Sequence, residues 1–384
     1  VKGLLSEVKA AGNVILFIDE INCVSETLAP TMLQFLQNKT FGSHSVPEGW
    51  LIAAAGNPPE YNKSVREFDI VTLDRVRRMD IEADLDVWME YAWKKEIHGS
   101  ILAYLGMKKD HFYSVENTVD GKFFVTARGW EDLSEILKAY EELGVEITEN
   151  LIGEYLCRDE IARSFFASYQ LYRKYGEDYG LKRLLSGEMA EEEQQKKVKM
   201  AEGASFEERF LVTGLLLSGL NGSFLDYEKL DKETGAVYQE LLHLKAFLHD
   251  KKDMTALDEF TDVKKKSLAV RLEAELLNLE QQTTEEFVIR TLEEFSLTIR
   301  KEHITDTETG FERIRQLFTE MVEKRKDCAK KISRELERAF AFMKACFGDG
   351  QETVLFVTGL TRNSHAAAFI REYGCDPYFA CSEK

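Results

Sequence analysis

An acidic pair at the end of an apolar run is the first place in this sequence where side chains could do chemistry. Residues 14–18 read Val-Ile-Leu-Phe-Ile and lead directly into Asp19-Glu20. A continuous apolar run is typical of a buried parallel strand, and α/β sheets bind ligands beyond the carboxyl ends of their strands. There, Asp19 would hold Mg²⁺ and Glu20 would polarise a water molecule for attack on a phosphate. The alternative is that the pair only caps the next helix, because acidic side chains also favour helix N-termini.

A second group of polar residues follows the next apolar stretch. Residues 50–55 predict a short strand that ends in Gly56-Asn57-Pro58, and the spacing of apolar residues in 27–37 predicts a helix between the two strands. Strand, helix and strand in this order favour a parallel pair, so both strands end at the same edge. The Asn57 amide would then lie beside the acidic pair. On its own, Asn-Pro is an ordinary turn.

Two arginine-containing segments complete the set of candidates. Leu73-Asp74-Arg75 is followed by Arg78, and Thr126 is expected to cap a helix that opens with Ala127-Arg128-Gly129. The alternative for the first segment is a basic helix end that pairs with an acidic surface.

The order of these elements resembles the MoxR branch of the AAA+ ATPases. The resemblance covers residues 1–175 and rests on Asp-Glu-Ile-Asn at 19–22, Gly-Asn-Pro at 56–58, Leu-Asp-Arg at 73–75 and the later Arg-initiated helix. It implies ATP and Mg²⁺ as cofactors, in hexameric rings that remodel or mature a partner protein, often one of von Willebrand A type. The implied roles are Walker B for Asp19 and Glu20, sensor 1 for Asn57, arginine finger for Arg75 with Arg78 as the alternative, and sensor 2 for Arg128.

Three departures from the family pattern set limits on this resemblance. Cys23 stands where family members usually have Arg, and the stretch between Asn57 and Arg75 lacks their Leu-Pro element. No G-x-x-x-x-G-K-[ST] phosphate-binding loop occurs in the chain. We therefore expect a missing N-terminal portion to carry that loop, and the 384-residue chain to bind ATP weakly and hydrolyse it negligibly. The rival explanation is a degenerate scaffold without a phosphate-binding loop.

Composition narrows the function further. The net charge of −18 argues against a broad nucleic-acid or membrane-surface role, because phosphates attract basic patches. The six cysteines contain no CxxC pair, which favours free thiols in a cytoplasmic protein. No run approaches the length of a membrane-spanning helix, so we expect no membrane segment.

Proline placement and periodicity predict the domains. No proline lies between Pro59 and Pro377, which favours helices throughout that range. The predicted fold is α/β plus α: a partial parallel-sheet core, a helical lid with a hairpin at 111–125, a linker, and a mostly helical C-terminal domain. A strand at 353–358 and a helix at 364–373 are expected near the C-terminus. The domain ranges are 1–83, 84–185, 186–204 and 205–384.

Two other functions stay open at this stage. One is an AAA+ motor that serves nucleic-acid transactions, which a basic pore would favour. The other is a non-catalytic interaction scaffold with a degenerate ATPase core.

Overall fold

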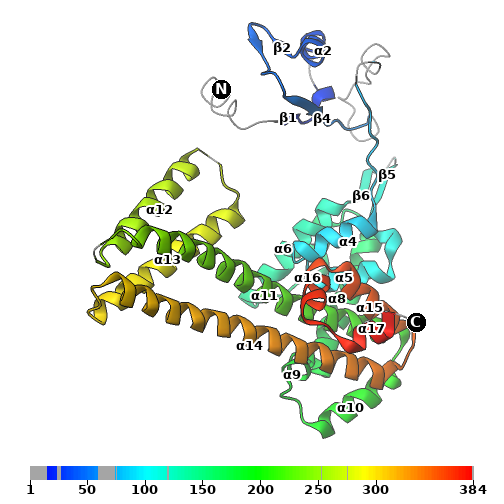
Figure 1. Cartoon of the computed structure of the whole chain (residues 1–384). Coiled ribbons are helices and arrows are strands. Elements are labelled where there is room, and N and C mark those ends of the chain that lie inside the picture. Colours follow the sequence, from blue (N-terminus) through cyan, green and yellow to red (C-terminus); the bar gives the residue numbers. More distant parts are fainter. Residues whose placement is uncertain are drawn as a thin grey trace. The chain divides into compact units, whose positions relative to one another are not determined.

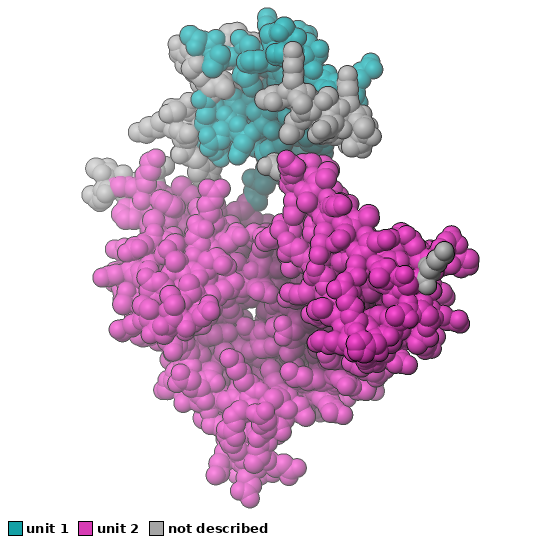
Figure 2. All heavy atoms as spheres, turned by 90° about the vertical axis from the view of Figure 1, so that its left-hand side faces the viewer, with its two compact units in different colours: residues 1–82 teal, residues 83–384 magenta. Residues whose placement is uncertain are grey.

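The computed structural model divides the chain into two compact units, residues 1–82 (unit 1) and 83–384 (unit 2). Figure 1 traces the chain and Figure 2 colours the two units. Each unit is described by itself. The structure describes residues 15–23, 27–58, 74, 76–118, 121–251, 253–274 and 276–382.

Unit 1 is built on a parallel pair of short strands. Strand β1 (Ile15–Ile18) pairs with β4 (Leu51–Ala54) in the register Ile15 to Leu51 and Ile18 to Ala54. Between them the chain forms helix α2 (Ala29–Asn38) and a small antiparallel pair, β2 (Thr40–Phe41) and β3 (His44–Ser45). The strand–helix–strand order expected from the sequence is confirmed. The expected burial of the first strand is wrong, since Ile15 and Phe17 are more than 60% exposed in a sheet of only two strands. The β2–β3 pair was not foreseen.

Unit 2 is almost entirely helical, with one hairpin. Strands β5 (Ser114–Thr118) and β6 (Gly121–Val125) pair antiparallel, as the Asp120-Gly121 signal predicted. The helices that form the base of the unit are α4 (Leu85–Lys94), α5 (Gly99–Met107), α6 (Ala127–Leu143), α7 (Glu149–Tyr155), α8 (Asp159–Tyr179), α9 (Leu181–Ser186), α10 (Glu191–Glu202), α15 (Gln351–Arg362), α16 (Ser364–Tyr373) and α17 (Asp376–Ser382).

Four further helices form a long arm that leaves this base (Figure 1). They are α11 (Phe206–Leu248), α12 (Ala256–Glu273), α13 (Leu279–Lys301) and α14 (Thr307–Phe347). At about 1.5 Å per residue, the 43-residue α11 and the 41-residue α14 are each roughly 60 Å long. Each contributes to two cores, one in the base and one in the arm.

An aromatic group anchors the core of the base. Trp130, Tyr104 and Phe165 are almost fully buried, and their ring centroids lie 5.3 to 5.9 Å apart. The Trp130 indole N–H donates to the Phe112 carbonyl at 3.1 Å. Such tilted and edge-on contacts add to the large apolar area that each ring buries.

Residues 186–204, expected to be a linker or a solvated helix, contain helix α10, whose Ala201 is fully buried in the core of the base. The expected strand at 353–358 is wrong, because residues 351–362 form helix α15. Its β-branched residues favoured a strand locally, but Phe356 and Leu360, four residues apart, are both buried on one helix face. The helix expected at 364–373 is confirmed as α16.

Candidate functional site at the β1–β4 edge

The acidic pair and the Gly-Asn pair leave the sheet of unit 1 at the same edge. Beyond the Ile18–Ala54 pair the ladder continues, with the Ala55 N–H donating to the Ile18 carbonyl at 2.9 Å. The Ile21 N–H then donates to the Ala55 carbonyl at 3.0 Å. Asp19 and Glu20 therefore lie between two backbone hydrogen bonds that attach them to the end of β4.

The backbone at Glu20 is held in an unusual conformation. Its φ is 51°, in the left-handed region, where a non-glycine residue costs about 1–2 kcal/mol. The other described non-glycine residues with positive φ, at positions 39, 96 and 303, each follow a helix end, whereas Glu20 follows a strand. The Glu20 N–H donates to Asp19 Oδ1 at 2.9 Å, and both side chains are exposed. Residues held in such conformations cluster at functional sites.

Asn22 connects the turn that follows β1 to the turn that follows β4. Its Nδ2 donates to the Asn57 carbonyl at 2.8 Å, which ties the turn after β1 to the turn after β4. The Asn22 carboxamide occupies the space where Gly56 would carry a Cβ, only 2.5 Å from Oδ1. A side chain at position 56 would therefore displace Asn22. Sequence reasoning assigned no role to Asn22 or Gly56, although both stand inside the motifs that it used.

The donor atoms at this edge suit Mg²⁺. Mg²⁺ prefers oxygen ligands and is commonly bound through one or two carboxylates together with water and substrate phosphates. Asp19 keeps Oδ2 available, the Glu20 carboxylate is exposed, and the Asn22 Oδ1 is buried with no hydrogen-bond partner. In the described part of the chain, no group of three or more His, Cys, Asp or Glu side chains is placed to hold a metal by itself. The edge therefore fits an ion that a substrate helps to bind.

Two of the described cations of unit 1, Lys39 and Arg78, are engaged elsewhere. The Lys39 ammonium donates to the Trp50 carbonyl at 2.6 Å. The Arg78 guanidinium pairs with Asp80 at 2.7 Å, and both side chains are largely exposed. Within the described residues of unit 1 we find no cluster of basic groups that would cradle phosphates.

Cys23 completes the turn after the acidic pair. Partial burial, and then the charge and hydrogen bonding of Glu20 and the charge of Asp19, raise the pKa of its thiol. A thiol in this position stays protonated at neutral pH and is a poor nucleophile, because the thiolate is the reactive form.

The arginine candidates belong to other segments of the chain than the β1–β4 edge. Arg75 lies outside the described residues. Arg128 belongs to unit 2, where it is exposed in the first turn of α6. As predicted, Thr126 caps this helix by accepting the Gly129 N–H at 3.2 Å, and Gly144 ends it in the left-handed conformation.

In unit 2, a serine contacts a histidine, and the same histidine contacts an acidic side chain. Ser100 Oγ lies 2.7 Å from His98 Nδ1, and His98 Nε2 lies 3.1 Å from a Glu141 carboxylate oxygen. The order serine, histidine, acid is that of a hydrolase triad, but in a triad Nε2 faces the serine and Nδ1 faces the acid, the reverse of the arrangement here. In addition, Ser100 is only 2% exposed and His98 also accepts the Ser100 N–H, so the group caps α5 inside the core. We therefore assign these three residues a structural role.

Comparisons with protein families, with curated proteins and with solved structures found no match for this chain. The candidate function of this chain therefore rests on the geometry of the β1–β4 edge. None of the described helices is both long enough and apolar enough to cross a membrane.

Proposed function

We propose that unit 1 forms the hydrolysing half of an ATP site in a divergent AAA+ ATPase of MoxR type. The observation that carries the proposal is the parallel register of β1 and β4, which places Asp19, Glu20 and Asn57 at one strand edge. Carboxylates and a carboxamide at such an edge suit metal-dependent phosphoryl transfer.

Each residue has a separate task in this proposal. Asp19 holds Mg²⁺, directly or through water, and the bound ion neutralises charge on the nucleotide phosphates. Glu20 accepts a hydrogen bond from the attacking water and orients it as a general base. Asn57 orients the same water from the neighbouring strand, and the Asn22 hydrogen bond fixes its backbone.

The arginines act from elsewhere in the assembly. Arg75, with Arg78 as the alternative, reaches the site of a neighbouring subunit in a homo-oligomeric ring and stabilises transition-state charge. Arg128 senses the nucleotide from the helical lid. The ring works in the cytoplasm and uses hydrolysis to remodel or mature a partner protein, together with a von Willebrand A-type partner.

In this proposal, unit 1 supplies the groups for hydrolysis, and groups outside its described residues bind the nucleotide phosphates. No G-x-x-x-x-G-K-[ST] loop occurs in the 384 residues. We accordingly keep the prediction that these residues alone hydrolyse ATP negligibly. Measurable turnover by the purified 384-residue chain would contradict that prediction.

The test is ATP turnover by the full-length protein as the cell makes it. We expect Glu20→Gln to lower kcat by about 100-fold or more while ATP binding persists, because a general base contributes roughly 10²–10⁴-fold. Glu48→Gln is the matched control, since Glu48 is an exposed acid of the same unit away from the strand edge. Turnover that survives in Glu20→Gln overturns the assignment of Glu20, and a wild-type protein without any turnover favours the non-catalytic scaffold.

Metal binding gives a test that does not need turnover. Mn²⁺ replaces Mg²⁺ at oxygen sites and broadens the NMR signals of nearby residues. We expect broadening at residues 19–22 and 56–57 in the 384-residue chain, and its loss in Asp19→Asn. Equal broadening in wild type and Asp19→Asn would count against a metal site at this edge.

A further inference from the structure

A basic cavity lies in the base of unit 2, far along the chain from the acidic edge of unit 1. Its volume is about 330 Å³, and it is lined by Ser186 at the end of α9 and by five residues of α14. Four of those five carry positive charge and one carries negative charge. They are Lys330, Lys331, Arg334, Arg338 and Asp327.

The cations form one face of α14. Positions 327, 330, 331, 334 and 338 recur at intervals of three and four residues, so their side chains share one side of the helix. Like charges four residues apart, such as Lys330 with Arg334 and Arg334 with Arg338, destabilise a helix by a few tenths of a kcal/mol per pair. The chain as a whole carries a net charge of −18, so a concentrated positive face is contrary to its general composition. An anion bound between these groups would remove the repulsion.

Arg338 is fixed in place by the end of α9. Its Nη1 donates to the Leu185 carbonyl at 2.7 Å. Gly187 has a φ of 80°, and a Cβ there would lie 2.4 Å from the Arg338 guanidinium carbon. Glycine at this position therefore lets the planar guanidinium pack against the backbone. The remaining N–H donors of Arg338 are presented with little loss of side-chain freedom on binding.

Arg334 is available for a ligand. It is exposed and makes no hydrogen bond or ion pair with any residue in the described part of the chain. By contrast, Lys330 pairs with Asp327 at 2.9 Å, and Lys331 lies 3.7 Å from the buried carboxylate of Glu335. Because the acids near the cavity are paired with the lysines, N–H donors of the two arginines are available to a bound ligand.

We propose that this cavity binds a small anion that carries at least two phosphate groups. Guanidinium groups bind phosphate oxygens in pairs, and the two arginines, whose charges the neighbouring acids do not pair, match an anion charge of two. The volume suits a small molecule, and the acidic surface of the rest of the chain disfavours a long polyanion. This site is separate from the hydrolytic edge of unit 1 and stands whether or not that edge hydrolyses ATP.

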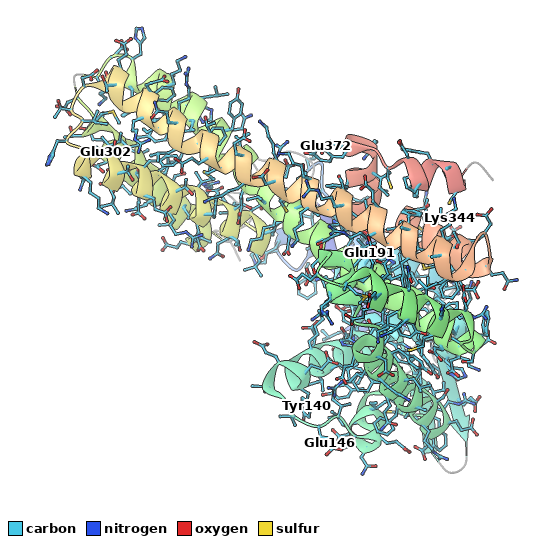
Figure 3. All side chains as sticks on the ribbon, turned by 90° about the horizontal axis from the view of Figure 1, so that it is seen from below. Tyr140, Glu146, Glu191, Glu302, Lys344 and Glu372 are labelled. Atoms are coloured by element: carbon cyan, nitrogen blue, oxygen red, sulfur yellow. The ribbon has the colours of Figure 1, made fainter. Side chains whose placement is uncertain are left out.

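Inorganic pyrophosphate is the probe, measured by calorimetry on the 384-residue chain at about 0.1 M salt. We expect Arg334→Gln to weaken binding by about tenfold, since a charge-assisted hydrogen bond to phosphate is lost. Lys344→Gln removes an equal charge from the same helix, outside the cavity lining, near the C-terminal end of α14 (Figure 3), and should change affinity less than twofold. Glu48→Gln, which alters an exposed acid of unit 1 outside the β1–β4 edge, should leave pyrophosphate affinity unchanged.

The variants also define what would overturn the proposal. Arg334 is exposed and unpaired, so Arg334→Gln should unfold at the wild-type temperature and a loss of fold would not explain weaker binding. Absence of binding to wild type at millimolar pyrophosphate contradicts the proposal. So does an equal loss in Lys344→Gln, which would indicate nonspecific attraction. A single-stranded oligonucleotide that binds more tightly than pyrophosphate, with the same dependence on Arg334, would replace the small ligand with a nucleic acid.

Discussion

Units 1 and 2 use their acidic residues in different ways. In unit 1, Asp19 and Glu20 are exposed at a strand edge, and the only bond described between them runs from a backbone N–H. In unit 2, Glu335 is 4% exposed and accepts the Ser223 hydroxyl, and Glu141 accepts hydrogen bonds from His98 and Tyr169. Acids that already have partners stabilise a fold, whereas exposed acids beside a strained backbone are available to a ligand.

The two units differ in the same way in their apolar residues. The buried apolar side chains described in unit 1 are Ile21, Phe35 and Trp50, while Ile15, Phe17 and Leu51 of its sheet are more than 60% exposed. Unit 2 has a continuous core in its base and a second core in its arm. The stability of the described chain therefore resides mainly in unit 2, and its candidate chemistry resides mainly in unit 1. This contrast can be tested by substitutions in both units.

The largest effect is expected in the core of the base. Trp130→Ala removes a fully buried ring and its hydrogen bond to Phe112, and should lower the free energy of unfolding by about 3–5 kcal/mol. Leu143→Ala on the same helix, where the side chain is 74% exposed, should change it by less than about 0.5 kcal/mol. Urea denaturation followed by circular dichroism at 222 nm measures both. Similar losses in the two variants would show that the base lacks the rigid core described above.

The next effect concerns the link between the two turns of unit 1. Asn22→Ala breaks the hydrogen bond to the Asn57 carbonyl, and Gly56→Ala displaces the same carboxamide. Each should lower ATP turnover by about tenfold with little change in KM, since misplacing a positioning group mainly affects the chemical step. Because both changes break one contact, the double variant should be no slower than either single variant. Multiplied effects of about 100-fold would mean that the two residues act separately.

A smaller effect separates a structural residue from a functional candidate in the first turn of α6. Thr126→Ala removes the helix cap and should cost about 1 kcal/mol of stability with turnover retained. Arg128→Ala removes an exposed side chain, so stability should change by less than about 0.5 kcal/mol while turnover falls. Thermal unfolding and ATP hydrolysis measured on both variants check the pair. If Arg128→Ala leaves turnover at the wild-type rate, Arg128 has no sensor role.

Local sequence patterns were sufficient for several elements of both units. The apolar run before Asp19 and the Asp120-Gly121 turn correctly predicted β1 and the β5–β6 hairpin, and Thr126 with Gly144 set the ends of α6. In each case the information lies within a few neighbouring residues. The parallel register of β1 and β4 followed from chain order, and it is what brings Asn57 to the acidic pair.

Long-range packing decided what the sequence could not predict. Helix α15 contains β-branched residues that favour a strand, and only burial of Phe356 and Leu360 in a core assembled from distant helices selects the helix. Helix α11 continues without interruption from the base into the arm and contributes to both cores. The contact of Asn22 with Gly56 joins two loops, and no local pattern indicates which glycine lies under which side chain.

The smallest expected effect is a pH dependence that belongs to unit 2. Burial, together with the charges of Lys108 and Arg158, lowers the pKa of His111 below its ordinary 6.5, against the opposing charges of Asp110 and Glu160. The ring Nδ1 also lies 2.6 Å from the Tyr104 hydroxyl. The unfolded chain therefore binds a proton at a higher pH than the folded chain does, so stability falls as the pH drops through 6.5.

A second group titrates in a different range, which allows the two contributions to be separated. Burial alone would raise the pKa of Glu141, but hydrogen bonds from His98 and Tyr169 and the charge of Arg173 outweigh it and lower the pKa below 4.5. Its stabilising contribution is thus present above 4.5 and is lost only at lower pH. Between pH 7.5 and pH 5, we expect wild type to lose more stability than His111→Gln in urea denaturation, and below pH 4.5 both should weaken. Identical losses in the upper range would show that His111 is as readily protonated in the folded base as in the unfolded chain.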